Sequence, residues 1–274
     1  MKKLTSRQKK RYGIIAAIVL PLFIITFILR LPFYYAVVFY FAAFLISIVF
    51  YYPNYIAVWA NWNYIRGNEE AALKFLKTAV NRNTKSPAAH HNYALLLMRG
   101  GDGRTALETL EKALTLNPKL ITEKNIRLAI GSCYWVTGDI NAAIETLEDM
   151  RNRYEYVNAH VLATLGYMYH LSGDEDKALD LTNKAIEDSP EYAAAWDNLG
   201  QIYFSRNDMI KAKDAFETAL SHKPGLADSN YYLGLIFENE NPEKAREYFE
   251  KAANCKITAL NTVTKEQIEA KLNK

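Results

Sequence analysis

The chain carries two different patterns of hydrophobic and polar positions. From Gly13 to Tyr52 the only charged side chain is Arg30, whereas from Pro53 onward charges are dense and regularly spread. A long uncharged apolar run is typical of membrane-spanning helix, and regularly mixed positions are typical of packed amphipathic elements. The sequence therefore predicts an apolar N-terminal part joined to a globular helical part.

The apolar run is too long for one bilayer crossing, which takes about 20 helical residues. It is interrupted at Arg30-Leu31-Pro32, where a guanidinium is costly in mid-bilayer and a proline discourages helix in the residue before it. These features predict a transmembrane helical hairpin over residues 13–52, with helices at 13–29 and 33–52 and a turn at 30–32. No small-x-small cleavage site follows residue 29, so a cleaved signal peptide is not expected.

Charge placement predicts the orientation of that hairpin. Residues 1–12 form a basic tail with six cations, and the hairpin tip has one. By the positive-inside rule the N-terminus is cytoplasmic, and two crossings return the chain to the cytoplasm. The predicted location is therefore the plasma membrane, multi-pass, with the rest of the chain cytoplasmic. Membrane lipid is the expected partner of residues 13–52 and of the basic tail.

The remainder of the chain repeats itself. Residues 196–224 align with residues 162–190 at a constant offset of 34, which brings Gly200, Tyr203, Asp208, Ala212, Ala219 and Pro224 onto Gly166, Tyr169, Asp174, Ala178, Ala185 and Pro190. The same internal spacing recurs upstream from Gly131 and from Ala94, more weakly from Ala60, and downstream from Gly234. Six copies of one unit therefore cover residues 53–254.

This pattern resembles the tetratricopeptide repeat family, whose signature is W-x2-L-G-x2-Y, a Gly-Asp turn, A-x3-F and a closing Pro. The unit from Trp196 to Pro224 matches every position of that signature. Asn63 stands where an aromatic belongs, and Thr182 stands at a normally bulky position. The resemblance implies a right-handed α-solenoid of about six helix pairs, so that with the preceding two-helix transmembrane hairpin the expected fold is all-α. The expected units lie near 53–86, 87–120, 124–157, 159–192, 193–226 and 227–254, with a C-terminal capping helix in residues 255–274.

Each repeated residue type has a packing role. Glycine or alanine in the first helix of a unit allows close approach of the second helix. Dipeptides such as Gly173-Asp174 and Asn207-Asp208 supply a left-handed residue that ends one helix and a cap that begins the next. Since no unit buries its apolar face alone, the stack needs its neighbours and its caps.

The sequence contains no arrangement of residues that is typical of a catalytic, metal-binding or cofactor-binding site. The five histidines lack any ligand spacing, and the two cysteines are far apart. The chain has 33 basic and 30 acidic residues, but no acid precedes Glu69, so the net positive charge comes from the N-terminal tail. A broad nucleic-acid surface is therefore not indicated. We therefore expect that the protein is not an enzyme, and that it binds no metal, no cofactor and no nucleic acid.

The resemblance implies that the first helix of each unit lines a concave groove that receives a partner peptide segment or amphipathic helix. No basic residue occupies the inner positions beside Asn92 and Asn198, so a clamp for a terminal carboxylate is not expected. The residues that this register places in the partner-binding groove are His91, Leu95, Met98, Leu128, Ser132, Trp135, Tyr167, His170, Asp197, Gln201, Phe204 and Tyr231.

The sequence thus predicts a membrane-anchored scaffold or adaptor that binds a protein partner near the cytoplasmic membrane face. Its Lys-, Asn- and Ile-rich composition looks bacterial, which by analogy favours an envelope assembly adaptor. Two alternatives stay open: a regulatory sensor that binds a small signalling peptide or ligand, and a non-catalytic subunit of a membrane enzyme or transporter. The sequence leaves the oligomeric state open.

Overall fold

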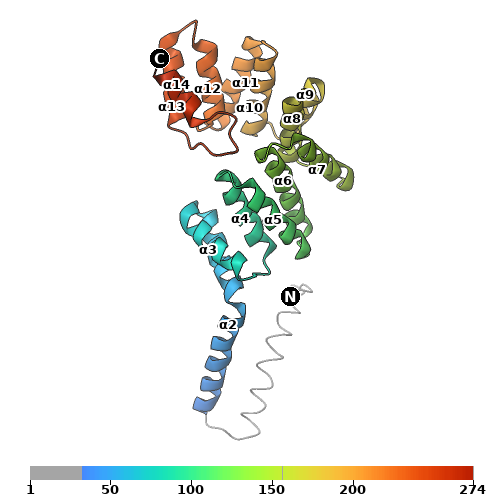
Figure 1. Ribbon diagram of the computed structural model, residues 1–274, viewed down its shortest axis with the longest axis vertical. Coiled ribbons are helices and arrows are strands. Elements are labelled where there is room, and N and C mark those ends of the chain that lie inside the picture. Colours follow the sequence, from blue (N-terminus) through green and yellow to red (C-terminus); the bar gives the residue numbers. More distant parts are fainter. Residues whose placement is uncertain (1–32, 156, 274) are drawn as a thin grey trace, which may run out of the picture.

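The computed structural model describes residues 33–155 and 157–273, and in this part of the chain it is an all-α solenoid of thirteen helices. The helices wind into a curved stack from which the first helix projects as a long rod (Figure 1). In chain order they are α2 (Phe33–Ile65), α3 (Glu69–Asn81), α4 (Pro87–Arg99), α5 (Gly103–Thr115), α6 (Leu120–Val136), α7 (Ile140–Arg153), α8 (Ala159–Ser172), α9 (Glu175–Asp188), α10 (Ala193–Ser205), α11 (Met209–His222), α12 (Ala227–Phe237), α13 (Pro242–Ala253) and α14 (Lys265–Leu272).

The helices form six consecutive pairs, from α2 with α3 to α12 with α13, and each pair packs chiefly on the next. α2 begins at Phe33, well before the first unit expected at 53–86, and α6 begins at Leu120, before the third unit expected at 124–157. The succession of six pairs nevertheless confirms the predicted all-α solenoid. Such quasi-one-dimensional stacking explains why the chain buries its apolar residues in a series of local clusters.

The predicted turn chemistry is also confirmed. Gly101, Gly138 and Gly173 have φ of +85°, +85° and +87°, and Asn207 has φ of +60°. In each case the following aspartate caps the next helix, as Asp208 does by accepting a hydrogen bond from the Lys211 amide. The left-handed residue and the cap together fix where the second helix of each unit starts.

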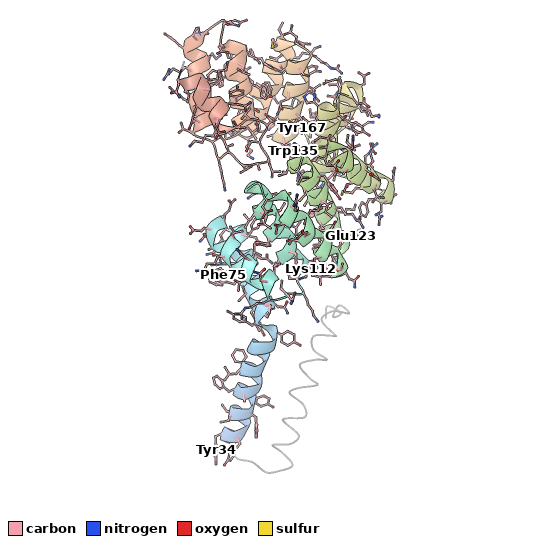
Figure 2. All side chains as sticks on the ribbon, viewed as in Figure 1. Tyr34, Phe75, Lys112, Glu123, Trp135 and Tyr167 are labelled. Atoms are coloured by element: carbon pink, nitrogen blue, oxygen red, sulfur yellow. The ribbon has the colours of Figure 1, made fainter. Side chains whose placement is uncertain are left out.

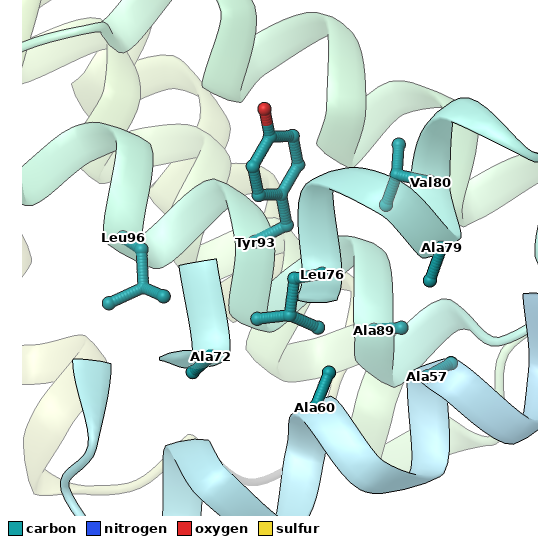
Figure 3. Packing of buried hydrophobic residues seen from close by; sticks show 9 residues of the cluster. All are labelled: Ala57, Ala60, Ala72, Leu76, Ala79, Val80, Ala89, Tyr93 and Leu96. Atoms are coloured by element: carbon teal, nitrogen blue, oxygen red, sulfur yellow. The ribbon is translucent and has the colours of Figure 1, made fainter. Parts of the chain in front are cut away.

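Small residues let the two helices of a unit approach closely. A Cβ added at Gly200 would lie 2.5 Å from the Phe216 ring, and one at Gly166 would lie 2.7 Å from Oγ1 of Thr182. In the first unit alanines take this role, and Ala60 and Ala72 pack around Leu76 (Figure 3). The small and bulky positions that repeat in the sequence therefore correspond to contacts between the two helices of a unit.

The membrane prediction requires correction. Within the residues that the structure describes, no helix combines the length and apolarity needed to cross a membrane. The predicted second span, 33–52, is the first part of α2, which runs unbroken through Pro53 to Ile65 and packs against α3. A crossing needs about 20 apolar residues in one helix, so the predicted multi-pass plasma-membrane location is contradicted. The basic tail, the first predicted span and the turn at 30–32 lie outside the described residues.

The C-terminal residues divide into two parts. The predicted cap corresponds to α14, where Thr264 and Gln267 form a capping box and Ile268 is fully buried. The ten residues before it, 255–264, are not helical; they leave the end of α13 and extend toward α4 (Figure 1). We call residues 255–264 the strap.

Candidate partner-binding groove

The concave side of the solenoid holds a cavity of about 560 Å³. Its walls come from the first helices of the third to sixth units, and the strap closes it on the remaining side together with residues of α3 and α4. This volume falls in the range of about 300–1,000 Å³ that is usual for ligand sites. The residues that line the cavity include Glu69, Arg99, Trp135, Tyr167, Tyr192, Asp197, Gln201, Lys223, Asp228, Lys256, Leu260, Asn261 and Thr262.

Aromatic side chains form one wall of the cavity. The rings of Trp135 on α6 and Tyr167 on α8 meet edge to face with centroids 5.5 Å apart (Figure 2). Burial raises the pKa of the phenols of Tyr167 and Tyr192, the latter to about 12, so both stay neutral hydrogen-bonding groups at physiological pH. Rigid aromatics of this kind supply contact area at low entropic cost.

A buried carboxylate pair forms the opposite wall. Asp197 on α10 accepts hydrogen bonds from the Ser229 hydroxyl and, at 2.9 Å, from Nε2 of Gln201. Burial and the negative charge of Asp228 raise the pKa of Asp197 to about 7. Asp197 therefore stays protonated to higher pH than an exposed aspartate does.

Asp228 on α12 holds the strap. Its carboxylate is 7% exposed and accepts four hydrogen bonds of 2.8–2.9 Å, from the Asn261 amide, the Thr262 hydroxyl and the backbone amides of Thr262 and Val263. A carboxylate that accepts several donors in this way fixes the backbone that presents them. We call these contacts the anchor.

Residues 256–259, within the strap, reach the first two units. The Ala259 amide donates to the Arg99 carbonyl oxygen at 3.2 Å, and the Lys256 ammonium pairs with the Glu69 carboxylate. Arg99 pairs with the same carboxylate at 2.6 Å. We call the contacts of Lys256 and Ala259 with α3 and α4 the latch. The cavity lining includes three acidic residues, Glu69, Asp197 and Asp228, and three basic residues, Arg99, Lys223 and Lys256.

The structure brings together five of the twelve predicted groove residues. Ser132, Trp135, Tyr167, Asp197 and Gln201 all line the cavity. This subset comes from the third, fourth and fifth units, where the predicted register matches the concave wall.

The other seven lie elsewhere. Met98 is 1% exposed and packs in the core with Leu95 alongside it, and Leu128 lines a separate hollow of about 190 Å³ beside Val161. The remaining four make local contacts, His91 with Asn92, His170 with Glu175, Phe204 with Tyr232, and Tyr231 with Phe249.

Sequence reasoning missed the strap and the residues that hold it. Asp228 and Lys223 were not predicted, and the strap residues were assigned to the capping helix. One available signal was the length of chain between the end of the last unit near Asn254 and the Thr264 cap, since this stretch carries no repeat pattern. A connection of that length exceeds the two to eight residues usual between packed helices.

Other polar groups of the described residues fit packing roles. No group of three or more His, Cys, Asp or Glu side chains in the described part of the chain is placed to hold a metal ion. Burial raises the pKa of the Cys133 thiol to about 12, which makes it an inert core residue rather than a nucleophile.

Two of the repeat units match models of a known family. Two family models described as tetratricopeptide repeat match the chain, one over residues 87–120 and the other over residues 193–226. Tetratricopeptide repeat protein 5 of Bos taurus is 25% identical over 142 residues, which cover 46% of this chain and 32% of the relative. The peroxisomal targeting signal receptor of Candida albicans is 22% identical over 189 residues, which cover 66% of this chain and 32% of the relative. The chain thus spans about a third of the length of these curated relatives.

Solved structures match the fold. A tetratricopeptide repeat protein from Parabacteroides merdae superposes with a TM-score of 0.65 at 18% identity, over 81% of this chain and 83% of that chain. A tetratricopeptide repeat protein of Thermus thermophilus gives a TM-score of 0.55 at 18% identity, over 73% of this chain and 98% of that chain. At these identities the likeness concerns the fold alone.

Proposed function

Because this chain is a tetratricopeptide repeat protein and thus an interaction scaffold of a typically non-catalytic kind, we propose that its concave cavity holds an extended peptide segment of a protein partner. The observation that carries the proposal is the strap, a non-helical segment of this chain that already lies along the cavity and uses the hydrogen-bonding groups of its wall. An amphipathic helix, the other occupant considered from the sequence, lacks such a precedent in the structure.

The lining suggests what the segment looks like. Because acidic and basic groups balance around the cavity, a strongly charged segment gains little there. Trp135 and Tyr167 offer aromatic area, and Asp228 accepts amide and hydroxyl donors. The partner segment is therefore largely uncharged, with side chains such as Asn or Thr beside an apolar residue.

The curated relatives give limited support. One is named for the receptor of a targeting signal, and a third relative, the photosystem I assembly protein Ycf3 of Prochlorococcus marinus, is 35% identical over 76 residues covering 27% of this chain and 44% of the relative. Receiving a signal and assisting assembly both involve binding another protein. No particular partner of this chain follows from these names.

A library of displayed twelve-residue peptides, selected on the full-length chain, tests the proposal. Retained peptides are expected to bind Trp135→Ala at least tenfold more weakly, because the variant removes the aromatic wall. Ile210→Ala is the matched control, since Ile210 is an apolar residue 77% exposed on α11, away from the cavity lining. Peptides that bind both variants equally, or no retained peptides at all, would refute the proposal.

A second candidate function is a sensor of a small ligand, and the cavity size favours it. A volume of about 560 Å³ suits a small molecule as well as a few residues of peptide. Thermal-shift measurements of the full-length chain with a library of small polar aromatic compounds test this candidate. A stabilisation that Trp135→Ala abolishes would support it, and the absence of any shift across the library would count against it.

A further inference from the structure

The strap joins α13 to α14, and it is held very differently at the anchor and at the latch. At the anchor, one carboxylate that is 7% exposed accepts four hydrogen bonds. At the latch, the Lys256 side chain is 66% exposed and the Glu69 side chain 32% exposed. Charge-assisted hydrogen bonds in a buried setting are about twice as strong as neutral ones, whereas exposed ion pairs contribute little and are screened by salt. The strap therefore opens at the latch and stays attached at the anchor.

Apolar packing reinforces the anchor side. Val263 is 3% exposed and lies in a cluster with Ala227, Ala252 and Ile268, and Cys255 and Ile257 of the strap pack against the same cluster. Both ends of the strap are therefore continuous with the packing of the last unit and α14. At the latch side, Ala259 is exposed and the contact with α4 is one backbone hydrogen bond. Release of the latch thus leaves the last unit and its cap intact.

The strap also forms a wall of the cavity. Thr258, Leu260, Asn261 and Thr262 face the same space as Trp135 on α6. Asn261 and Thr262 are held by Asp228, so release of the latch frees only the part of this wall that Thr258 and Leu260 form. This part lies on the side of the cavity toward Glu69 and Arg99, so a peptide that continues past that side would overlap it.

We propose that the strap is an internal occupant that gates the groove, so that a partner peptide enters only after the Lys256–Glu69 and Ala259–Arg99 contacts open while Asp228 keeps hold of Asn261–Val263. This inference rests on the proposed peptide-binding function. It adds that the partner competes with residues 258–260 for the groove wall, and that ionic strength favours the open groove by screening the latch.

An engineered disulfide tests the gate. A Cβ added at Gly101 would lie 3.9 Å from Cβ of Ala259, which matches the Cβ separation of a disulfide, about 3.5–4.5 Å. The chain Gly101→Cys/Ala259→Cys, with Cys255→Ser to prevent mispairing, is oxidised with diamide, and bond formation is checked by mass. Gly101→Cys with Cys255→Ser is the control for backbone strain at the glycine, whose φ is +85°.

The probe is the set of peptides that the displayed library yields on the wild-type chain. Oxidation of the double-cysteine chain is expected to weaken their binding at least tenfold, and reduction is expected to restore it, with no such change in the single-cysteine control. Unchanged binding in the oxidised chain overturns the gate but leaves the proposed function standing. If the reduced chain and the wild type retain no peptide, the proposed function itself fails. If the two cysteines do not pair, the strap does not lie against Gly101, and the gate is overturned.

A second measurement follows the latch without any peptide. Lys256→Gln removes the ion pair, and hydrogen exchange at the Ala259 amide is expected to quicken at least threefold; in the wild type, raising salt should act in the same direction. Lys251→Gln is the matched control, because it removes an equal charge that pairs with Glu247 within α13. Equal exchange rates in wild type, Lys256→Gln and Lys251→Gln overturn the proposed weak latch.

Discussion

At the residue scale, Thr182 occupies a position where the other units place larger apolar side chains. It is fully buried on α9, and its hydroxyl is one of two buried side-chain groups without a hydrogen-bond partner among the described residues. Leaving a hydroxyl unsatisfied costs about 1–3 kcal/mol. Thr182→Val is therefore expected to raise the free energy of unfolding by roughly 1 kcal/mol, measured by urea denaturation of the full-length chain.

A buried threonine whose hydroxyl is satisfied provides the control. Thr109 on α5 is 7% exposed and donates to the Thr105 carbonyl oxygen at 2.7 Å. Thr109→Val is expected to be neutral or destabilising, because it removes a hydrogen bond. A loss of stability in Thr182→Val equal to that in Thr109→Val would contradict this account of the site.

Asp197 predicts a pH dependence. Its folded pKa of about 7 lies above the ordinary value of 3.8, so between these values the folded chain binds more protons than the unfolded chain. Stability therefore falls as pH rises through this window. Asp197→Asn cannot titrate, so its unfolding free energy is expected to vary less between pH 4 and pH 7, by up to about 1.4 kcal/mol per pH unit.

Asp208→Asn is the control for the pH dependence of the unfolding free energy. The Lys211 ammonium lowers the pKa of Asp208, so its contribution is lost only below the ordinary carboxyl range. Urea denaturation at half-unit pH steps should then give Asp208→Asn the wild-type slope between pH 4 and pH 7. A wild-type slope in Asp197→Asn as well would show that Asp197 ionises normally.

At the element scale, the close approach of the helices in each unit depends on a missing side chain. A Cβ at Gly200 would lie 2.5 Å from the Phe216 ring, which is fully buried and cannot move aside freely. Gly200→Ala is expected to lower the unfolding free energy by about 1–3 kcal/mol, as other overpacked cores do. Gly225→Ala, where an added Cβ would meet nothing within 4 Å, is expected to change it by less than about 0.5 kcal/mol. Similar losses in both variants, measured by thermal unfolding, would contradict this packing account.

Elements whose structure is determined by adjacent residues could be predicted from the sequence, whereas elements that depend on contacts between distant residues could not. The Gly173-Asp174 turn follows from two adjacent residues, so the sequence identified both the left-handed residue and the cap. The strap depends on contacts with Glu69 and Arg99, which are far away in the chain. No sequence pattern in residues 255–264 predicts these contacts. The apolar run was assigned to a membrane from composition alone, whereas the structure continues its second half into a helix of the first unit.

The candidate site was predicted in part for the same reason. The repeat register assigns concave positions unit by unit, and three of these positions, Trp135, Tyr167 and Asp197, line the cavity. It could not tell how far each helix rotates, so Met98, one predicted wall residue, lies in the core instead. Asp228 escaped prediction because its role is to hold a segment that has no repeat pattern.

At the scale of the whole molecule, stability is expected to be lost unit by unit. The cap α14 buries Ile268 against Ala252 and Val263. Ile268→Ala is expected to cost about 2–4 kcal/mol and, by hydrogen exchange, to loosen α12 and α13 before α4 and α5. Ile210→Ala, at a residue 77% exposed, is the control and should leave the exchange pattern unchanged. Uniform loosening of all units in Ile268→Ala would mean that the solenoid unfolds as one cooperative body.

The central claim is that the concave cavity, gated by the strap, is where a partner segment binds. The most direct measurement attaches a benzophenone to a peptide retained by the wild-type chain and maps its photo-crosslinks by mass spectrometry. The account predicts crosslinks to α6, α8, α10 and residues 255–264. Crosslinks confined to α7, α9 and α11, or to the exposed face of α2, would contradict it.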